Sequence, residues 1–194
     1  MRIRVYNLIV LTLVLFAASL AAETQTGSEV NREYQVKAAF LYNFIKFVDW
    51  PEETSDTNKP IIIGIIGKDS FGDAFEPIKD KPVKDRKVII KRFEGLSQMD
   101  KSGKHPQTEA IRECDLLFIC SSEKGKLKET LDLLKDRSVL TIADMPGFLE
   151  AGGIVNFVIE ENKVGFEINV AAAENAKLKI RSQLLRLAKR VVEK

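Results

Sequence analysis

Four polar residues follow directly after segments that the sequence predicts to be buried strands: Asp69, Ser121, Ser122 and Asp144. In an open parallel sheet the carboxyl ends of the strands surround the crevice where ligands bind, so these side chains can line one shallow small-molecule site. They form no recognisable catalytic set, and the acidic pair and lysine of a phosphoacceptor receiver are missing. Ordinary loop polarity is the other interpretation, and the sequence leaves both open.

Motifs for catalysis or metal binding are also missing from the sequence. His105 is the only histidine, and there is no H-x-x-x-H or C-x-x-C spacing for a metal. No G-x-S-x-G elbow supports a Ser-His-Asp triad. The turn from Gly64 to Gly72 lacks phosphate-binding spacing, so we interpret it as a tight turn with Asp69 or Ser70 capping a helix. We expect no cofactor, no metal and no enzymatic activity.

The two cysteines, Cys114 and Cys120, flank the apolar run DLLFI, which reads as a buried strand. At about 3.3 Å per residue such a strand holds them about 20 Å apart, whereas a disulfide needs Cα atoms within about 7 Å. We therefore expect two free thiols, or one thiol paired across a dimer. Cys114 lies at the mouth of the strand and is the better candidate for reactivity.

The first 22 residues have the pattern of a secretory signal peptide. Arg2 and Arg4 form a basic start, and an uncharged apolar run ends in small residues at Ala22. An uncleaved anchor is the alternative, because an uncharged run of about 18 residues barely spans a bilayer. We expect residues 23–30 to form a flexible junction and residues 31–194 to form a single exported domain.

Length and charge restrict the partners of this domain. About 172 residues fit one domain with a substantial core. Without the signal segment the chain has 28 basic and 28 acidic side chains. This balance argues against nucleic acid as the main partner.

Apolar periodicity predicts alternating strands and helices through the middle of the chain. Continuous β-branched runs are typical of strands that are buried on both faces. The expected strands are Ile61–Ile66, a more exposed one within Val83–Phe93, Asp115–Cys120 and Ser138–Ala143. The expected helices are Asn31–Val48, Asp69–Lys79, Thr108–Glu113 and Glu123–Lys135.

The pattern changes after the fourth strand. The sequence predicts two strands, Gly153–Glu160 and Lys163–Val170, that are joined by Glu161-Asn162 in a tight hairpin. Asn169 is placed to cap a short helix, and Ser182 to cap a terminal one that continues through Val192. The predicted fold is α/β, an open, mostly parallel sheet flanked by helices in three αβα layers, with an antiparallel hairpin as its final edge.

Several stretches in this order resemble the YfiR family of periplasmic regulators, from about Tyr34 to Val191. They are VKAAFLYNFIKFVDWP, IGIIGKDSFGDAF, CDLLFIC, VLTIADMPGF, GGIVNFVIEENKVGFEINVAAAENAKLKI and SQLLRLAK. The resemblance implies an exported, often dimeric α/β domain. It implies a repressor that docks on the periplasmic region of an inner-membrane diguanylate cyclase and is released by an outer-membrane lipoprotein, so controlling cyclic-di-GMP and biofilm formation. Family members have cysteines that form disulfides, and this sequence has no clear counterpart of such a pair.

The resemblance also implies a set of partner-binding residues within the matching motifs. Phe148 follows a Pro-Gly turn and is expected to be an exposed aromatic anchor, while Glu167 and Asn169 share one face of a strand. Structural roles in pairing and capping are the alternative for each residue. The full candidate set is Phe148, Asn156, Phe157, Glu167, Asn169, Gln183 and Leu184.

Two functions therefore remain open. The first is a non-enzymatic regulator that binds protein partners through the hairpin face. The second is a periplasmic small-molecule-binding domain, or an enzyme, that uses the crevice at Asp69, Ser121, Ser122 and Asp144.

Overall fold

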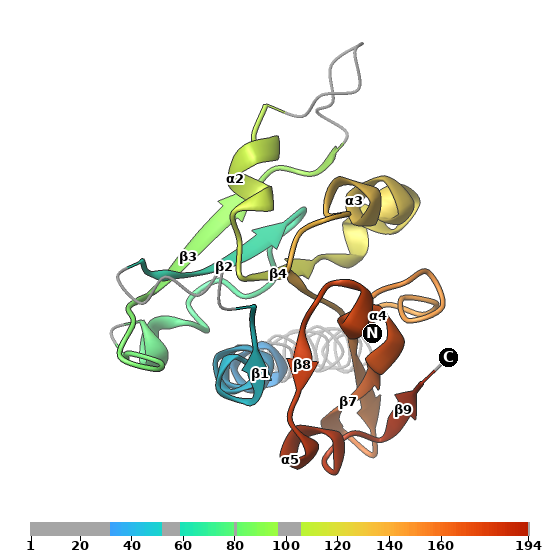
Figure 1. The fold of residues 1–194 in the computed structure, drawn as a ribbon. Helices are drawn as coiled ribbons and strands as arrows, with labels where there is room; N and C mark the ends of the chain where they lie inside the picture. Colours follow the sequence, from blue (N-terminus) through green and yellow to red (C-terminus); the bar gives the residue numbers. More distant parts are fainter. Residues whose placement is uncertain (1–31, 52–58, 80, 97–105, 194) are drawn as a thin grey trace, which may run out of the picture.

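Seven strands form one sheet in the computed structural model, which describes residues 32–51, 59–79, 81–96 and 106–193. The order across the sheet is β3-β2-β4-β5-β6-β7-β9 (Figure 1). All of its neighbouring strands are parallel except β6 and β7, which are antiparallel. The strands are β2 (Ile61–Ile66), β3 (Val88–Phe93), β4 (Leu116–Ile119), β5 (Leu140–Ala143), β6 (Val155–Glu160), β7 (Lys163–Asn169) and β9 (Arg190–Val192). The predicted α/β sheet is confirmed.

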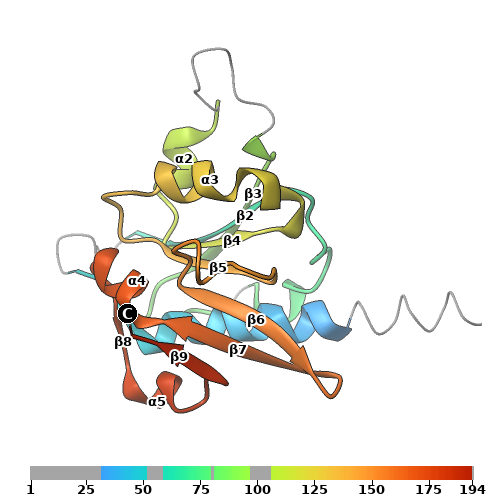
Figure 2. The ribbon, with the colours of Figure 1, turned by 90° about the vertical axis from the view of Figure 1, so that its right-hand side faces the viewer.

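Helices cover both faces of the sheet (Figure 2). One face packs against the long helix (residues 32–47), and the other carries α2 (Thr108–Arg112) and α3 (Leu127–Leu133). Successive residues of a strand point to opposite faces, so Leu116 and Phe118 of β4 join the cluster of the long helix, while Leu117 and Ile119 join the other. The long apolar strands are thus buried on both sides, as their composition predicted.

Local signals placed the hairpin and the helix after it correctly. Glu161 and Asn162 both have positive φ, 50° and 59°, which is the backbone that a two-residue hairpin turn requires. Asn169 caps α4 (Val170–Asn175), because its side-chain oxygen accepts a hydrogen bond from the N–H of Ala172.

The end of the chain differs from the prediction. The expected terminal helix is reduced to α5 (Ser182–Leu185), with Arg181 rather than Ser182 at its N-cap position. The chain then forms β9, which pairs in parallel with β7. The reason is non-local: the open edge of β7 offers backbone partners to residues 190–192, and this pairing overrides their helical periodicity.

Two predicted helices are also shorter than expected. Asp69–Lys79 is mostly turns, with a 3₁₀ helix only at Glu76–Ile78. Glu123–Lys135 divides into a 3₁₀ segment, Ser121–Lys126, and α3. Each segment contains a glycine, and glycine has a low helix propensity.

A second, two-stranded sheet pairs β1 (Val48–Asp49), at the end of the long helix, with β8 (Lys179–Ile180) in antiparallel fashion. Arg181 makes a bidentate ion pair with Asp49 beside it. The predicted signal segment, the junction and His105 lie outside the described residues. Within the described ranges, no helix has the length and apolarity needed to span a bilayer.

Candidate functional site

A groove of about 510 Å³ opens beyond the carboxyl end of β5. The long helix, the loop that follows β5, and the hairpin with β9 supply its walls. We call it the β5-end groove. Its lining consists of Glu33, Lys37, Asp144, Met145, Pro146, Gly147, Glu150, Asn156, Phe157, Val158, Ile159, Glu167 and Arg190.

A buried lysine lies at one side of this groove. Lys37 is 2% exposed, and its Nζ contacts Glu33 Oε1 and Asp144 Oδ2, each at 2.5 Å. Tyr34 donates its hydroxyl to the same Asp144 oxygen at 3.1 Å, and Lys37 Nζ lies 4.4 Å from the centre of the Tyr34 ring. These contacts attach the long helix to the end of β5. They also give the buried Lys37 ammonium the charged and hydrogen-bonding partners that it needs.

The same contacts keep the lysine charged. Burial lowers the pKa of Lys37, but the hydrogen bonds to Asp144 and Glu33 raise it by more, so that the net pKa lies above the usual value. The pKa of Tyr34 is also raised, by burial and by the charge of Asp144. Because both pKa values are raised, neither Lys37 nor Tyr34 is suited to act as a general base at neutral pH.

A second cation lies on the β9 side of the groove. Arg190 makes a bidentate pair with Glu167, at 2.9 Å for both contacts, and a further bond to Glu150 at 3.1 Å. The bidentate geometry fixes β9 against β7. The Glu167 side chain is only 19% exposed, and its charge is held by Arg190.

The groove gathers four of the predicted residues, and they come from both predicted sets. Asp144 was expected in the small-molecule crevice, whereas Asn156, Phe157 and Glu167 were expected at a protein contact. Asn156 is buried and accepts a hydrogen bond from Met145 N at 3.1 Å, which holds the loop after β5. Phe157 is 3% exposed, so most of its ring belongs to the core.

Phe148 is not the exposed anchor that the Pro-Gly turn suggested. Its side chain is fully buried, in the cluster on the α2 and α3 face. The loop after β5 folds back on itself, with Gly153 N donating to Phe148 O at 2.9 Å. Any side chain at Gly153 would collide with the Phe148 ring. The prediction failed because a Pro-Gly turn indicates only that the turn itself is exposed. It does not indicate that the loop folds back and buries the Phe148 ring.

The other predicted contact residues also have structural roles or lie elsewhere. Asn169 is 9% exposed and donates to Leu149 O at 3.0 Å while it caps α4. Leu184 is buried in the core, and Gln183 is exposed on α5 outside the groove lining. For Asn169 and Leu184, the structural alternative is the observed one.

The rest of the predicted crevice does not join Asp144 in the groove. Asp69 pairs with Arg92 and accepts a hydrogen bond from Phe71 N, which makes it a turn cap. Ser122 accepts a hydrogen bond from Lys68 N at 2.9 Å, and Ser121 is exposed. All three follow strand ends as predicted. Among these strand ends, only the end of β5 contributes to the lining of the groove.

Both cysteines are free and buried. The prediction that they do not pair with each other is confirmed, but the expected reactivity of Cys114 is not. Burial raises the pKa of Cys114, and also that of Cys120, to about 12, which leaves both thiols protonated at neutral pH.

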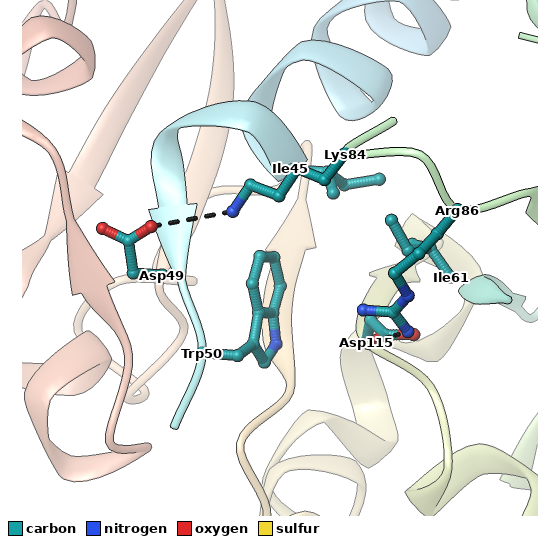
Figure 3. Close-up of a pocket in the computed structure, with 7 residues that line it drawn as sticks. All are labelled: Ile45, Asp49, Trp50, Ile61, Lys84, Arg86 and Asp115. Carbon is teal, nitrogen blue, oxygen red and sulfur yellow. Dashed lines mark ion pairs between the residues drawn. The ribbon is translucent and has the colours of Figure 1, made fainter. Parts of the chain in front are cut away.

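A smaller pocket of about 90 Å³ lies at the opposite, amino-terminal end of the strands (Figure 3). Its charged side chains face one another in two ion pairs, Lys84 with Asp49 and Arg86 with Asp115. Trp50 stands between them and donates its indole N–H to Ser138 O. This volume is below the range of about 300–1,000 Å³ that is usual for ligand sites, so we assign these contacts to structure.

The sequence reasoning missed the charged frame of the groove: Glu33, Lys37, Glu150 and Arg190. One local signal was available, because Glu33 and Lys37 have the i,i+4 spacing of a helical ion pair within a largely apolar helix. No group of three or more His, Cys, Asp and Glu side chains suited to a metal occurs in the described part of the chain. The lining of the groove likewise carries no recognisable catalytic set.

The fold is an α/β domain with a charged groove beyond the end of one strand. The chain belongs to the YfiR/HmsC-like family, whose model matches residues 34–189. That family is periplasmic and regulatory rather than catalytic, and it acts in the control of cyclic-di-GMP signalling. Its members interact with a periplasmic region of a signalling protein.

Of two similar solved structures, the one with the higher TM-score supports the fold. One is an ABC domain in complex with L-Trp from Streptococcus pneumoniae, at 13% identity and a TM-score of 0.54, covering 78% of this chain and 59% of that one. Another is a conserved domain protein from Vibrio cholerae, at 12% identity and a TM-score of 0.49, covering 67% and 54%. The chain thus spans a little over half the length of each. No curated protein sequence matches it.

Proposed function

We propose that this protein represses an inner-membrane diguanylate cyclase by direct contact between the β5-end groove and the periplasmic region of that enzyme. Family membership supports the signalling context. The observation that carries the proposal is the groove itself, where Asp144, Asn156, Phe157 and Glu167 meet beside an exposed apolar side chain, Ile159, which is 50% exposed. A partner seated in the groove would cover this side chain, and removing apolar surface from water favours association.

The rest of the family arrangement forms part of the same proposal. Release by an outer-membrane lipoprotein would free the cyclase and raise cyclic-di-GMP. Export by the signal segment would place the protein in the periplasm, where it would act as a homodimer.

Ile159→Arg tests the contact surface, because it places a long, charged side chain at the groove rim. We expect this variant to fold normally and to release the cyclase, which raises cellular cyclic-di-GMP to the level of a gene deletion. Ile89→Arg is the matched control. Ile89 is 42% exposed on β3, the edge strand that lies at the far side of the sheet from β6. It should repress like the wild type.

Two results would contradict the proposal. If Ile159→Arg represses normally, the groove is not the contact surface. If deletion of the whole gene leaves cyclic-di-GMP unchanged, the cyclase is not the target of this protein.

A small-molecule-binding role is the second candidate, because about 510 Å³ lies within the usual range for ligand sites. Native mass spectrometry of the purified protein would detect a retained ligand. Loss of that ligand in Ile159→Arg, with normal repression, would favour this second role.

A further inference from the structure

Strand β6 has a half-open edge inside the β5-end groove. It pairs with β7 along its whole length, from Val155 to Glu160, but its pairing with β5 stops at Asn156. Figure 2 shows the β6–β7 hairpin running on past the end of β5. From Phe157 onward, β6 therefore has a strand neighbour on one side only among the described residues.

The register identifies the backbone groups that face this open side. Asn169 N donates to Ile154 O at 2.8 Å, so the carbonyl of residue 154 faces β7. In an antiparallel pair, residues alternate between facing the partner strand and facing away from it. Val158 therefore faces β7, and Ile159 directs its N–H and C=O away from β7, past the end of β5.

The groove meets β6 at this edge and not at one face of the sheet. Four consecutive residues, 156–159, line it. Side chains of successive strand residues point to opposite faces, so a cavity that touches four in a row lies along the edge of the strand. Unpaired backbone groups at such an edge are a template for another extended chain.

The charges of the groove indicate the chemistry of such a chain. Carboxylates come from Glu33, Asp144, Glu150 and Glu167, while Lys37 and Arg190 are the only cations in the lining. Each cation is already shared by two of these carboxylates. The groove is thus net negative, and its remaining walls are mostly apolar.

We propose that an extended segment of a partner polypeptide, with at least one Lys or Arg beside apolar residues, adds to the sheet as a strand along β6 at Phe157–Glu160. Main-chain hydrogen bonds to Ile159 would supply affinity, and the acidic groove would select the basic side chain. This inference rests on the proposed function in taking the β5-end groove as the contact surface. It adds the mode of binding and the chemistry of the bound segment.

One pair of substitutions separates backbone pairing from side-chain contact. Ile159→Pro removes the N–H that faces the groove, and proline is tolerated where a strand N–H has no ladder partner. Ile159→Ala keeps that N–H and removes most of the side chain. Circular dichroism and thermal unfolding would verify that both variants fold.

The probe is a displayed library of random linear peptides of about ten residues, the upper length of a typical strand. Selection on the wild-type protein should enrich peptides that contain Lys or Arg with apolar residues. The selected peptides should bind Ile159→Pro at least about tenfold more weakly, and Ile159→Ala with a smaller loss, because a backbone hydrogen bond is lost only in the first.

Hydrogen exchange gives an independent readout within one strand. Addition of a selected peptide should slow exchange of the Ile159 amide about tenfold or more, whereas the Val158 amide, already bonded to β7, should change little. Failure to enrich any peptide, or equal binding to wild type and Ile159→Pro, would overturn strand addition. A wild-type dimer that Ile159→Pro converts to a monomer would also overturn it, because a second copy would then occupy the edge.

The purified periplasmic region of the cyclase distinguishes this inference from the proposed function. If it binds wild type and Ile159→Pro equally well, the repressor role stands and strand addition is wrong. If selected peptides behave as expected but the cyclase region does not bind, the strand site stands and the proposed function is wrong.

Discussion

Lys37 and Asp144 lie 107 residues apart in the chain, yet Lys37 Nζ donates a hydrogen bond to Asp144 Oδ2 at 2.5 Å. This contact joins the long helix to the residue that follows β5, where the sheet opens into the groove. The two side chains are 3% and 11% exposed, so neither charge is compensated by bulk water. The groove therefore depends on an ion pair that no local sequence pattern contains.

Lys37→Met should destabilise the protein by about 3 kcal/mol, because it leaves a buried Asp144 without its cation. Urea unfolding of the mature protein measures this change. The double variant Lys37→Met with Asp144→Leu removes both charges and should recover most of the loss. A single variant within about 0.5 kcal/mol of wild type would show that the pair is solvated in solution.

Phe148→Ala should lower stability by about 3–5 kcal/mol, since it leaves a cavity in the core on the α2 and α3 face. Phe148→Leu, which keeps most of the apolar volume, should cost less than half as much. Chemical denaturation of the two variants provides the comparison. A stable Phe148→Ala protein that nevertheless loses cyclase repression would instead return Phe148 to the contact surface.

Much of the fold could be predicted because its signals are local. The apolar runs of β2, β4 and β5 report burial on both faces, and Glu161-Asn162 has the residue types of a two-residue hairpin turn. Asn169 could be placed as a cap for the same reason, since a capping side chain bonds to a backbone group three residues on. In each case the interaction lies within a few residues.

The groove could not be predicted, because it depends on contacts between distant segments. Arg190 was read as part of a helix, although it pairs with Glu167 through a strand that forms only beside β7. Lys37 lies within the expected helix Asn31–Val48, and its side chain is buried by contacts that the helical pattern does not contain. The hairpin was expected to form the final edge of the sheet, but β9 covers β7 there, and β6 is open only where β5 ends early.

Cys114 and Cys120 should both resist alkylation in the folded protein. With a pKa of about 12, only about one thiol in ten thousand is ionised at pH 8, and both side chains are buried as well. Iodoacetamide labelling followed by mass spectrometry should be slow for native protein and complete for protein unfolded in guanidinium at the same pH. Rapid labelling of Cys114 in native protein would contradict the burial of the mouth of β4.

Glu167 and Glu150 both bind Arg190, but their substitution should have different local effects. Glu167 makes the bidentate contact and is 19% exposed, whereas Glu150 makes one contact and is 61% exposed. Glu167→Gln should therefore weaken the attachment of β9 more than Glu150→Gln does. Hydrogen exchange of the β9 amides would measure this difference.

The same pair of variants separates the structural role of these carboxylates from their charge. Each substitution removes one negative charge from the groove, so both should weaken binding of a Lys- or Arg-containing peptide, and added salt should reduce the difference from wild type. Equal loosening of β9 in the two variants would show that the bidentate pair does not hold this strand. Peptide binding that neither variant changes would show that the acidic lining does not select the bound segment.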